Sequence, residues 1–149
     1  MVAHPVNAPG SRVVVGLDLE VPEPALSTAF EQAAMRALPL TVIRAWTLPP
    51  VGGPGVVVPI AGFDLDELER QERSGVAAVV RKAAGDHPDV TVESVMPRGG
   101  PSQVLVEASA SSELVVVGAH GRGWFSGLML GSTSADVAAH ALAPVLVAR

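Results

Sequence analysis

The sequence contains no cysteine, which excludes disulfide bonds, thiolate metal sites and thiol nucleophiles. It contains no tyrosine either, and aromatic residues make up only 3% of the chain, too few to form a platform on which nucleic-acid bases stack. Lys and Arg number 10 against 15 Asp and Glu, giving a formal net charge of −5. Because phosphate backbones are bound by clustered cations, we expect no nucleic acid partner.

Long hydrophobic runs are also absent, although the mean hydropathy is +0.39. Apolar runs such as Leu114 to Val117 fall far short of the ~20 residues that a membrane-spanning helix needs, so we expect no membrane partner. Residues 1–10 have no Lys or Arg ahead of an apolar segment and are interpreted as a disordered leader rather than a signal peptide. The sequence therefore predicts a cytoplasmic protein.

Hydrophobic periodicity divides the chain into alternating strands and helices. Short runs rich in Val, Leu and Ile predict strands, whereas apolar residues at three- and four-residue steps predict helices. The expected strands cover 12–18, 40–46, 90–95, 113–118 and 144–149. The expected helices cover 22–38, 64–84, a short segment after 98–101, and 132–142. The acidic residues at 64–72 are interpreted as a solvated helix face.

This alternation predicts an α/β fold: a doubly wound, mostly parallel sheet with helices on both faces. The 149 residues match the size of one domain, and no internal repeat is found, so we expect a single domain over 1–149. Residues 47–63 are rich in Pro and Gly and are expected to form a long loop.

In an open parallel sheet, ligands bind beyond the carboxyl ends of the strands. Two loops stand out there. Asp18 follows the first strand, and the loop after the fourth strand holds five glycines (Gly118, Gly121, Gly123, Gly127 and Gly131). Glycines allow positive φ and close backbone approach, and their amides together with a helix N-terminus favour an anion. The glycine-rich loop therefore predicts a phosphate site.

The common phosphate and catalytic motifs are absent. No G-x-x-x-x-G-K-[ST] motif occurs, and Ser126 stands where a G-x-G-x-x-G motif needs its third glycine. No G-x-S-x-G motif occurs either, and the four histidines lack the spacing of a metal site. We expect no metal site within the protein itself and no catalytic residues, and binding rather than catalysis.

The glycine pattern nevertheless resembles a known signature. Gly118, two residues, Gly121, nine residues, Gly131 and Ser132, placed after the strand LVVVG, resemble the nucleotide-binding signature of the universal stress protein family. The segments VVVGLD, LTVIRAW and PVLVAR resemble further strands of that family. The resemblance implies a five-stranded sheet of order 3-2-1-4-5 and ATP as the cofactor, with Mg²⁺ as a possible companion.

The resemblance also implies the site. In ATP-binding members, the aspartate after the first strand and nearby backbone hold adenine and ribose, a residue matching Ala45 packs on adenine, and the glycine loop binds the phosphates. Carried over, the cofactor-binding residues are Gly16, Asp18, Ala45, Val117, Gly118, Ala119, His120, Gly121, Arg122, Gly123, Gly131 and Ser132. The family also implies a homodimer through the edge strand at 144–149.

Three departures from the family pattern leave alternatives open. Leu19 and Glu20 stand where members commonly have small residues; Glu20 could repel phosphate or hold a bridging cation. Arg44 replaces a frequent histidine and is interpreted as a tolerated change. Asp18 could simply cap the first helix. The alternatives to an ATP-binding regulatory protein are a dimeric interaction module that binds no nucleotide and a weak ATPase.

Overall fold

The computed structural model describes residues 11–47, 64–119 and 130–149. The expected leader at 1–10 and nearly all of the expected loop at 47–63 lie outside the described residues. The strands are β1 (Val13–Gly16), β2 (Leu40–Ile43), β3 (Val92–Val95), β4 (Leu114–Gly118) and β5 (Val145–Ala148). The helices are α1 (Ala25–Arg36), α2 (Leu65–Ala84), α3 (Pro101–Ser109) and α4 (Ser132–His140).

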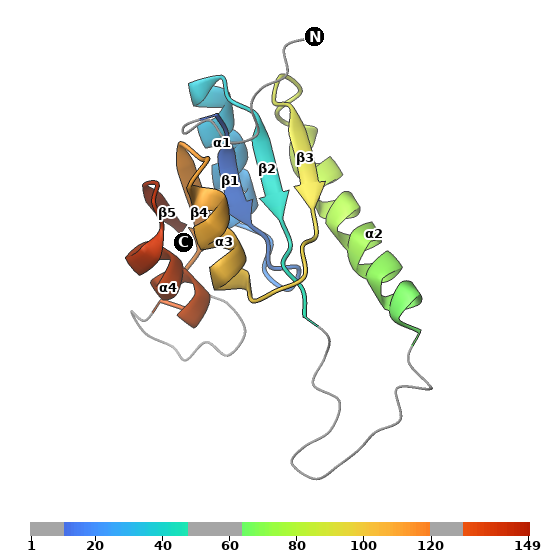
Figure 1. The fold of residues 1–149 in the computed structure, drawn as a ribbon. Helices are drawn as coiled ribbons and strands as arrows, with labels where there is room; N and C mark the ends of the chain where they lie inside the picture. Colours follow the sequence, from blue (N-terminus) through green and yellow to red (C-terminus); the bar gives the residue numbers. More distant parts are fainter. Residues whose placement is uncertain (1–10, 48–63, 120–129) are drawn as a thin grey trace.

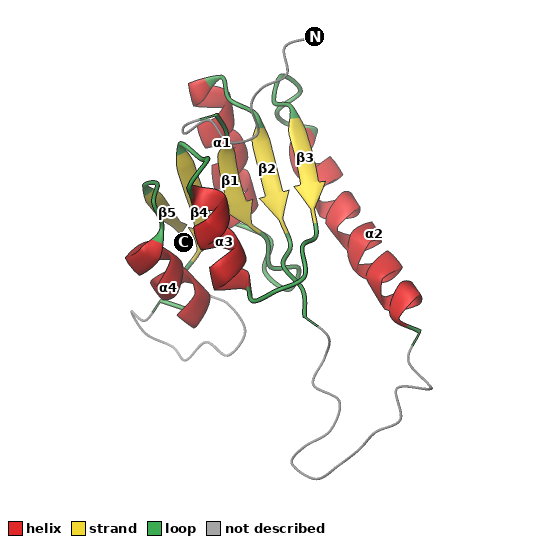
Figure 2. Ribbon diagram, viewed as in Figure 1, coloured by secondary structure: helices red, strands yellow, loops and turns green. Residues whose placement is uncertain are grey.

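The strands form one five-stranded sheet of order β3-β2-β1-β4-β5 (Figure 2). Every neighbouring pair is parallel. The predicted doubly wound sheet is therefore confirmed, and β1 and β4 lie side by side where the winding direction reverses. The first two strands are shorter than predicted, because β1 ends at Gly16 and β2 at Ile43.

Helices cover both faces of the sheet, α1 and α2 on one side and α3 and α4 on the other (Figure 1). Alternate residues of each strand enter different cores. Val13 and Val15 pack with Phe30 of α1, whereas Val14 packs with Leu105 of α3 and Val137 of α4. A strand that is buried on both faces must be apolar at every position, which explains the runs of valine.

Helix α2 begins as the sequence predicts. The side chain of Asp64 accepts a hydrogen bond from the amide of Glu67 (3.0 Å), which caps the helix. Its buried residues are Val76 and Val80, both in the C-terminal half. The N-terminal half extends past the carboxyl ends of the strands (Figure 1). Of the helices formed by the described residues, none combines the length and apolar character that crossing a membrane requires.

Ala37 ends α1 in the left-handed conformation, with φ 51° and ψ 41°. A Cβ atom is disfavoured there, so Ala37→Gly is expected to raise the free energy of unfolding by about 0.5–1 kcal/mol. Ala34→Gly, at an exposed position inside the same helix, is expected to lower it by a similar amount, about 0.5–1 kcal/mol. Urea titration followed by circular dichroism measures both, and equal signs for the two variants would contradict the expectation.

Candidate functional site

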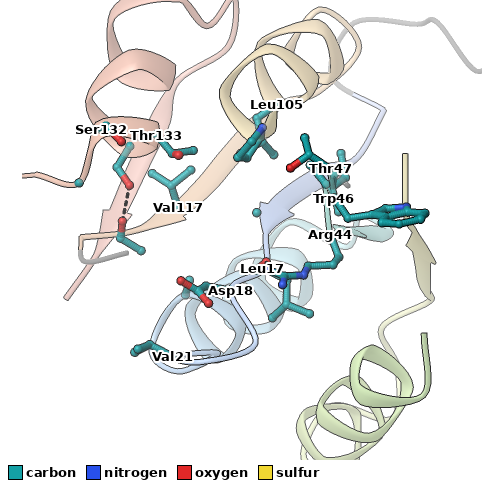
Figure 3. Close-up of a pocket in the computed structure, with 18 of the residues that line it drawn as sticks. Leu17, Asp18, Val21, Arg44, Trp46, Thr47, Leu105, Val117, Ser132 and Thr133 are labelled. Atoms are coloured by element: carbon teal, nitrogen blue, oxygen red, sulfur yellow. Dashed lines mark hydrogen bonds between the residues drawn. The ribbon is translucent and has the colours of Figure 1, made fainter. Parts of the chain in front are cut away.

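A cavity of about 550 Å³ lies at the carboxyl ends of β1, β2 and β4 (Figure 3). This is the location that the sheet order predicts. The turn after β1, the segment after β2, the N-terminal half of α2 and the starts of α3 and α4 all contribute to its wall. The predicted site residues that line it are Gly16, Asp18, Ala45, Val117, Gly118, Gly131 and Ser132.

Asp18 lies in the turn that leaves β1, on the cavity wall (Figure 3). Its Oδ1 accepts a hydrogen bond from the amide of Glu20 (2.9 Å), closing a local Asx turn. The residue that caps α1 is Pro24, so the alternative in which Asp18 caps this helix is wrong. The turn fixes a carboxylate at the cavity wall instead.

Gly16 and Ala119 have structural roles that the sequence does not suggest. A Cβ atom on Gly16 would lie 2.7 Å from Cδ1 of Leu105, so glycine permits α3 to approach the end of β1. Ala119 is buried, and its amide donates to the carbonyl oxygen of Ala148 (2.7 Å). It holds the end of β4 against β5 and does not line the cavity.

The centre of the glycine-rich loop cannot be placed. His120, Gly121, Arg122 and Gly123 were predicted to bind the phosphates, and all four lie outside the described residues. Their role stays a prediction.

The start of α4 faces the cavity with no side chain capping it. Gly131 is the N-cap residue, with φ −57°, so the positive φ that the glycine pattern suggested is not needed at this position. The hydroxyl of Ser134 donates to the carbonyl oxygen of Gly118 and so binds the helix to β4. Ser132 and Thr133 therefore present first-turn amides and hydroxyl groups to the cavity (Figure 3).

Helix α3 also begins at the cavity, which Pro101 and Leu105 line. Its N-cap residue is Gly100, and again no side chain caps the helix. The N-terminus of a helix carries a partial positive charge and unpaired amide groups. Two such ends at one cavity, neither with an acidic residue in its first turn, make this side of the cavity suited to an anion.

Arg44 and Glu72 are cavity residues that the sequence interpretation missed. Nε of Arg44 donates to Oε2 of Glu72 (3.0 Å), and Nη1 donates to the carbonyl oxygen of Leu17 (3.5 Å). Arg44 is therefore more than a tolerated change, and Glu72 is not part of a purely solvated face. The two residues are 28 positions apart, so no local pattern reveals the pair.

Aromatic and apolar groups complete the wall near the end of β2. Trp46 is only 7% exposed and lines the cavity next to Ala45. The guanidinium carbon of Arg98 lies 5.0 Å from the centroid of the Trp46 ring, a cation–π contact that fixes the indole. Within 11–47, 64–119 and 130–149, no group of three or more His, Asp or Glu residues is arranged to hold a metal ion.

Comparisons with known proteins agree with this architecture. The model of the universal stress protein family matches residues 11–149. A universal stress protein of Mycobacterium tuberculosis strain H37Rv is 36% identical over 150 residues, an alignment that covers 100% of this chain and 48% of that protein. The chain thus spans about half the length of the curated relatives it matches.

Solved structures share the fold. Universal stress protein UspA from Lactobacillus plantarum superposes with a TM-score of 0.74 at 21% identity, over 96% of this chain and 100% of that one. The universal stress protein from Archaeoglobus fulgidus, solved in complex with dAMP, has a TM-score of 0.59 at 24% identity, over 93% and 97% of the two chains.

Proposed function

The chain belongs to the universal stress protein family, and from this premise we propose that it binds ATP or a related adenine nucleotide in the cavity. The bound nucleotide regulates its interactions in a stress response, and we propose the cytoplasm as its location. The observation that carries the proposal is the pair of uncapped helix starts, α3 and α4, at one cavity. Both ends favour the negative charge of a phosphate.

The opposite parts of the cavity suit the nucleoside. Its volume of about 550 Å³ lies within the range of small-molecule sites, roughly 300–1,000 Å³. In the proposed pose, adenine packs against Ala45, the ribose hydroxyls donate to Asp18, and the phosphates lie at Ser132 and Thr133. The dAMP complex of the Archaeoglobus fulgidus relative supports this assignment of the base.

Magnesium is a proposed companion of ATP rather than a resident ion. A carboxylate and phosphate oxygens are the ligands that Mg²⁺ prefers, and Glu20 stands two residues after Asp18 beside the cavity. With a bridging cation, Glu20 supports phosphate binding; without one, it opposes it. We propose binding rather than turnover, and slow hydrolysis of ATP is the weaker alternative.

The first experiment identifies the nucleotide. The purified protein is denatured by heat, and chromatography of the supernatant shows which nucleotide is released. Calorimetric titration with ATP, AMP and adenosine, each with and without Mg²⁺, then gives the affinities. Failure of all three ligands to bind, together with no released nucleotide, would contradict the proposal and favour the interaction module that binds no nucleotide.

We also propose that the protein forms a homodimer through β5, because the two edge strands of the sheet differ in character. β3 carries the exposed Glu93, which accepts from the hydroxyl of Thr41 (3.1 Å) and pairs with Arg12 (3.9 Å). A charged side chain discourages pairing at an edge, whereas β5 is apolar throughout. A second copy of the chain is the partner that an antiparallel β5 pair would bring.

A proline tests the dimer without removing the bonds between β4 and β5. The carbonyl groups of Pro144 and Ala148 accept from β4, so the amide of Val147, by alternation, points away from β4 toward the open edge. Val147→Pro is expected to convert a dimer into a monomer, and Val147→Thr, which keeps the amide, is expected to leave the dimer intact. Light scattering measures both masses; a dimer in the proline variant, or a monomer before any change, would contradict the expectation.

A further inference from the structure

We propose that Arg44 and Glu72 are positioning residues for the nucleotide site, an inference that rests on the function proposed above. Their ion pair holds the N-terminal half of α2 against the cavity, so that binding of a nucleotide and the placement of this half of the helix are coupled.

The N-terminal half of α2 has little packing of its own. The two buried residues of the helix, Val76 and Val80, both lie in the C-terminal half, and the N-terminal half extends past the sheet (Figure 1). Among 65–74, no residue is fully buried. A helical segment with few buried apolar contacts opens at low free energy, so individual contacts decide where it lies.

Arg44 connects three elements at the edge of the cavity. It follows β2, donates from Nε to Glu72 of α2, and donates from Nη1 to the carbonyl of Leu17 after β1. The arginine side chain is 16% exposed and that of Glu72 is 27% exposed, so water screens this pair less than an ordinary surface pair. A guanidinium can make both contacts at once because its donors point in several fixed directions.

The same half of α2 forms one wall of the cavity. Leu68 and Glu72, one helical turn apart, both line it. Leu19 lies against the helix at Gly75, where a Cβ atom would be 3.3 Å from Cδ1 of Leu19. Leu19, one of the departures from the family pattern, thus packs the turn that carries Asp18 against α2, and Arg44 fixes the next turn of the helix.

Coupling follows from this arrangement. A ligand that contacts the wall binds most tightly when the wall is in place, and the ligand in turn stabilises that placement. Loss of the ion pair allows the helix to leave the wall, so part of the binding free energy must then be spent on restoring it. The nucleotide is expected to slow amide exchange in 65–74, and loss of the pair is expected to speed it.

The same helix supplies a matched control. Glu69 and Arg73 form an ion pair at 2.7 Å within 65–74, and neither residue lines the cavity. Arg73→Ala removes that pair without touching the proposed site. Glu72→Gln removes the charge of Glu72 with almost no change of shape, so the fold is retained.

The experiment measures AMP affinity by calorimetry and amide exchange of 65–74 by mass spectrometry. Glu72→Gln is expected to weaken AMP about three- to tenfold, between the effects of exposed and buried pairs, and to speed exchange in the free protein. Arg73→Ala is expected to change neither the affinity nor the protection that AMP brings. The charge swap Arg44→Glu with Glu72→Arg is expected to recover part of the affinity lost in Arg44→Glu alone, which a purely steric role would not produce.

Failure of this inference is distinguishable from failure of the proposed function. If AMP and ATP do not bind the unmodified protein, the nucleotide proposal fails, whereas exchange in the free Glu72→Gln variant still tests the attachment of the helix. If AMP binds but leaves exchange in 65–74 unchanged, and Glu72→Gln binds it with unchanged affinity, Arg44 and Glu72 are not positioning residues.

Discussion

Replacing Ser132 with aspartate is expected to lower the affinity for ATP more than 100-fold and to leave the affinity for adenosine unchanged. The new carboxylate would lie at the uncapped start of α4, where the phosphates are proposed to bind. Two unit charges about 4 Å apart repel by roughly 4 kcal/mol at an effective dielectric constant near 20, which is equivalent to a loss of about 100- to 1,000-fold. Adenosine carries no phosphate and does not meet this charge.

The same substitution has the opposite effect on stability. A carboxylate in the first turn of a helix interacts favourably with the dipole, so Ser132→Asp is expected to raise the free energy of unfolding by about 0.3–1 kcal/mol. Ser132→Asn is the neutral control and is expected to bind ATP within a few-fold of the parent. Calorimetry with both ligands and thermal unfolding test this; unchanged ATP affinity in Ser132→Asp would show that the phosphates do not lie at α4.

Asp18→Ala is expected to weaken adenosine, AMP and ATP by the same factor. The proposed hydrogen bonds from the ribose to the carboxylate are common to all three ligands, and loss of a charged acceptor is equivalent to about 1–3 kcal/mol, or roughly 5- to 150-fold. The equal loss separates this position from Ser132, where only the phosphorylated ligands are affected.

Two controls separate ligand contact from the local turn. Asp18→Asn keeps an acceptor for the amide of Glu20 and so retains the Asx turn, while it removes the charge. It is expected to bind adenosine at an affinity between those of the parent and Asp18→Ala. Asp86→Ala, beyond the C-terminal end of α2, is expected to bind like the parent. Equal adenosine affinity in all four proteins would leave Asp18 only its part in the turn.

The sequence predicted the sheet because each strand obeys one simple constraint: a strand covered by helices on both faces must be apolar throughout. The ends of β1 and β2 were placed too late for the same reason. Leu17 and the segment that includes Trp46 continue the apolar pattern, but they line the cavity instead of extending their strands. Periodicity records burial and does not distinguish the wall of a cavity from the interior of a sheet.

The candidate site divides in the same way. Asp18, Ala45, Gly131 and Ser132 could be predicted because each follows a strand or opens a helix, and chain order alone brings those points together. The pairing of Arg44 with Glu72 could not be predicted, because it depends on how far and at what rotation α2 lies across the sheet. Gly16 was chosen for a ligand, whereas its immediate neighbour is the side chain of Leu105.

The indole of Trp46 gives this protein an optical reporter inside its own cavity. The chain has two tryptophans and no tyrosine, so Trp124→Phe leaves Trp46 as the single indole fluorophore, free of tyrosine emission. Since this ring is 7% exposed and stacked beneath Arg98, its emission reports the polarity of the cavity wall at which adenine is proposed to pack. Ligand entry can then be followed by stopped-flow fluorescence without a label, which gives access to association and dissociation rates as well as affinities.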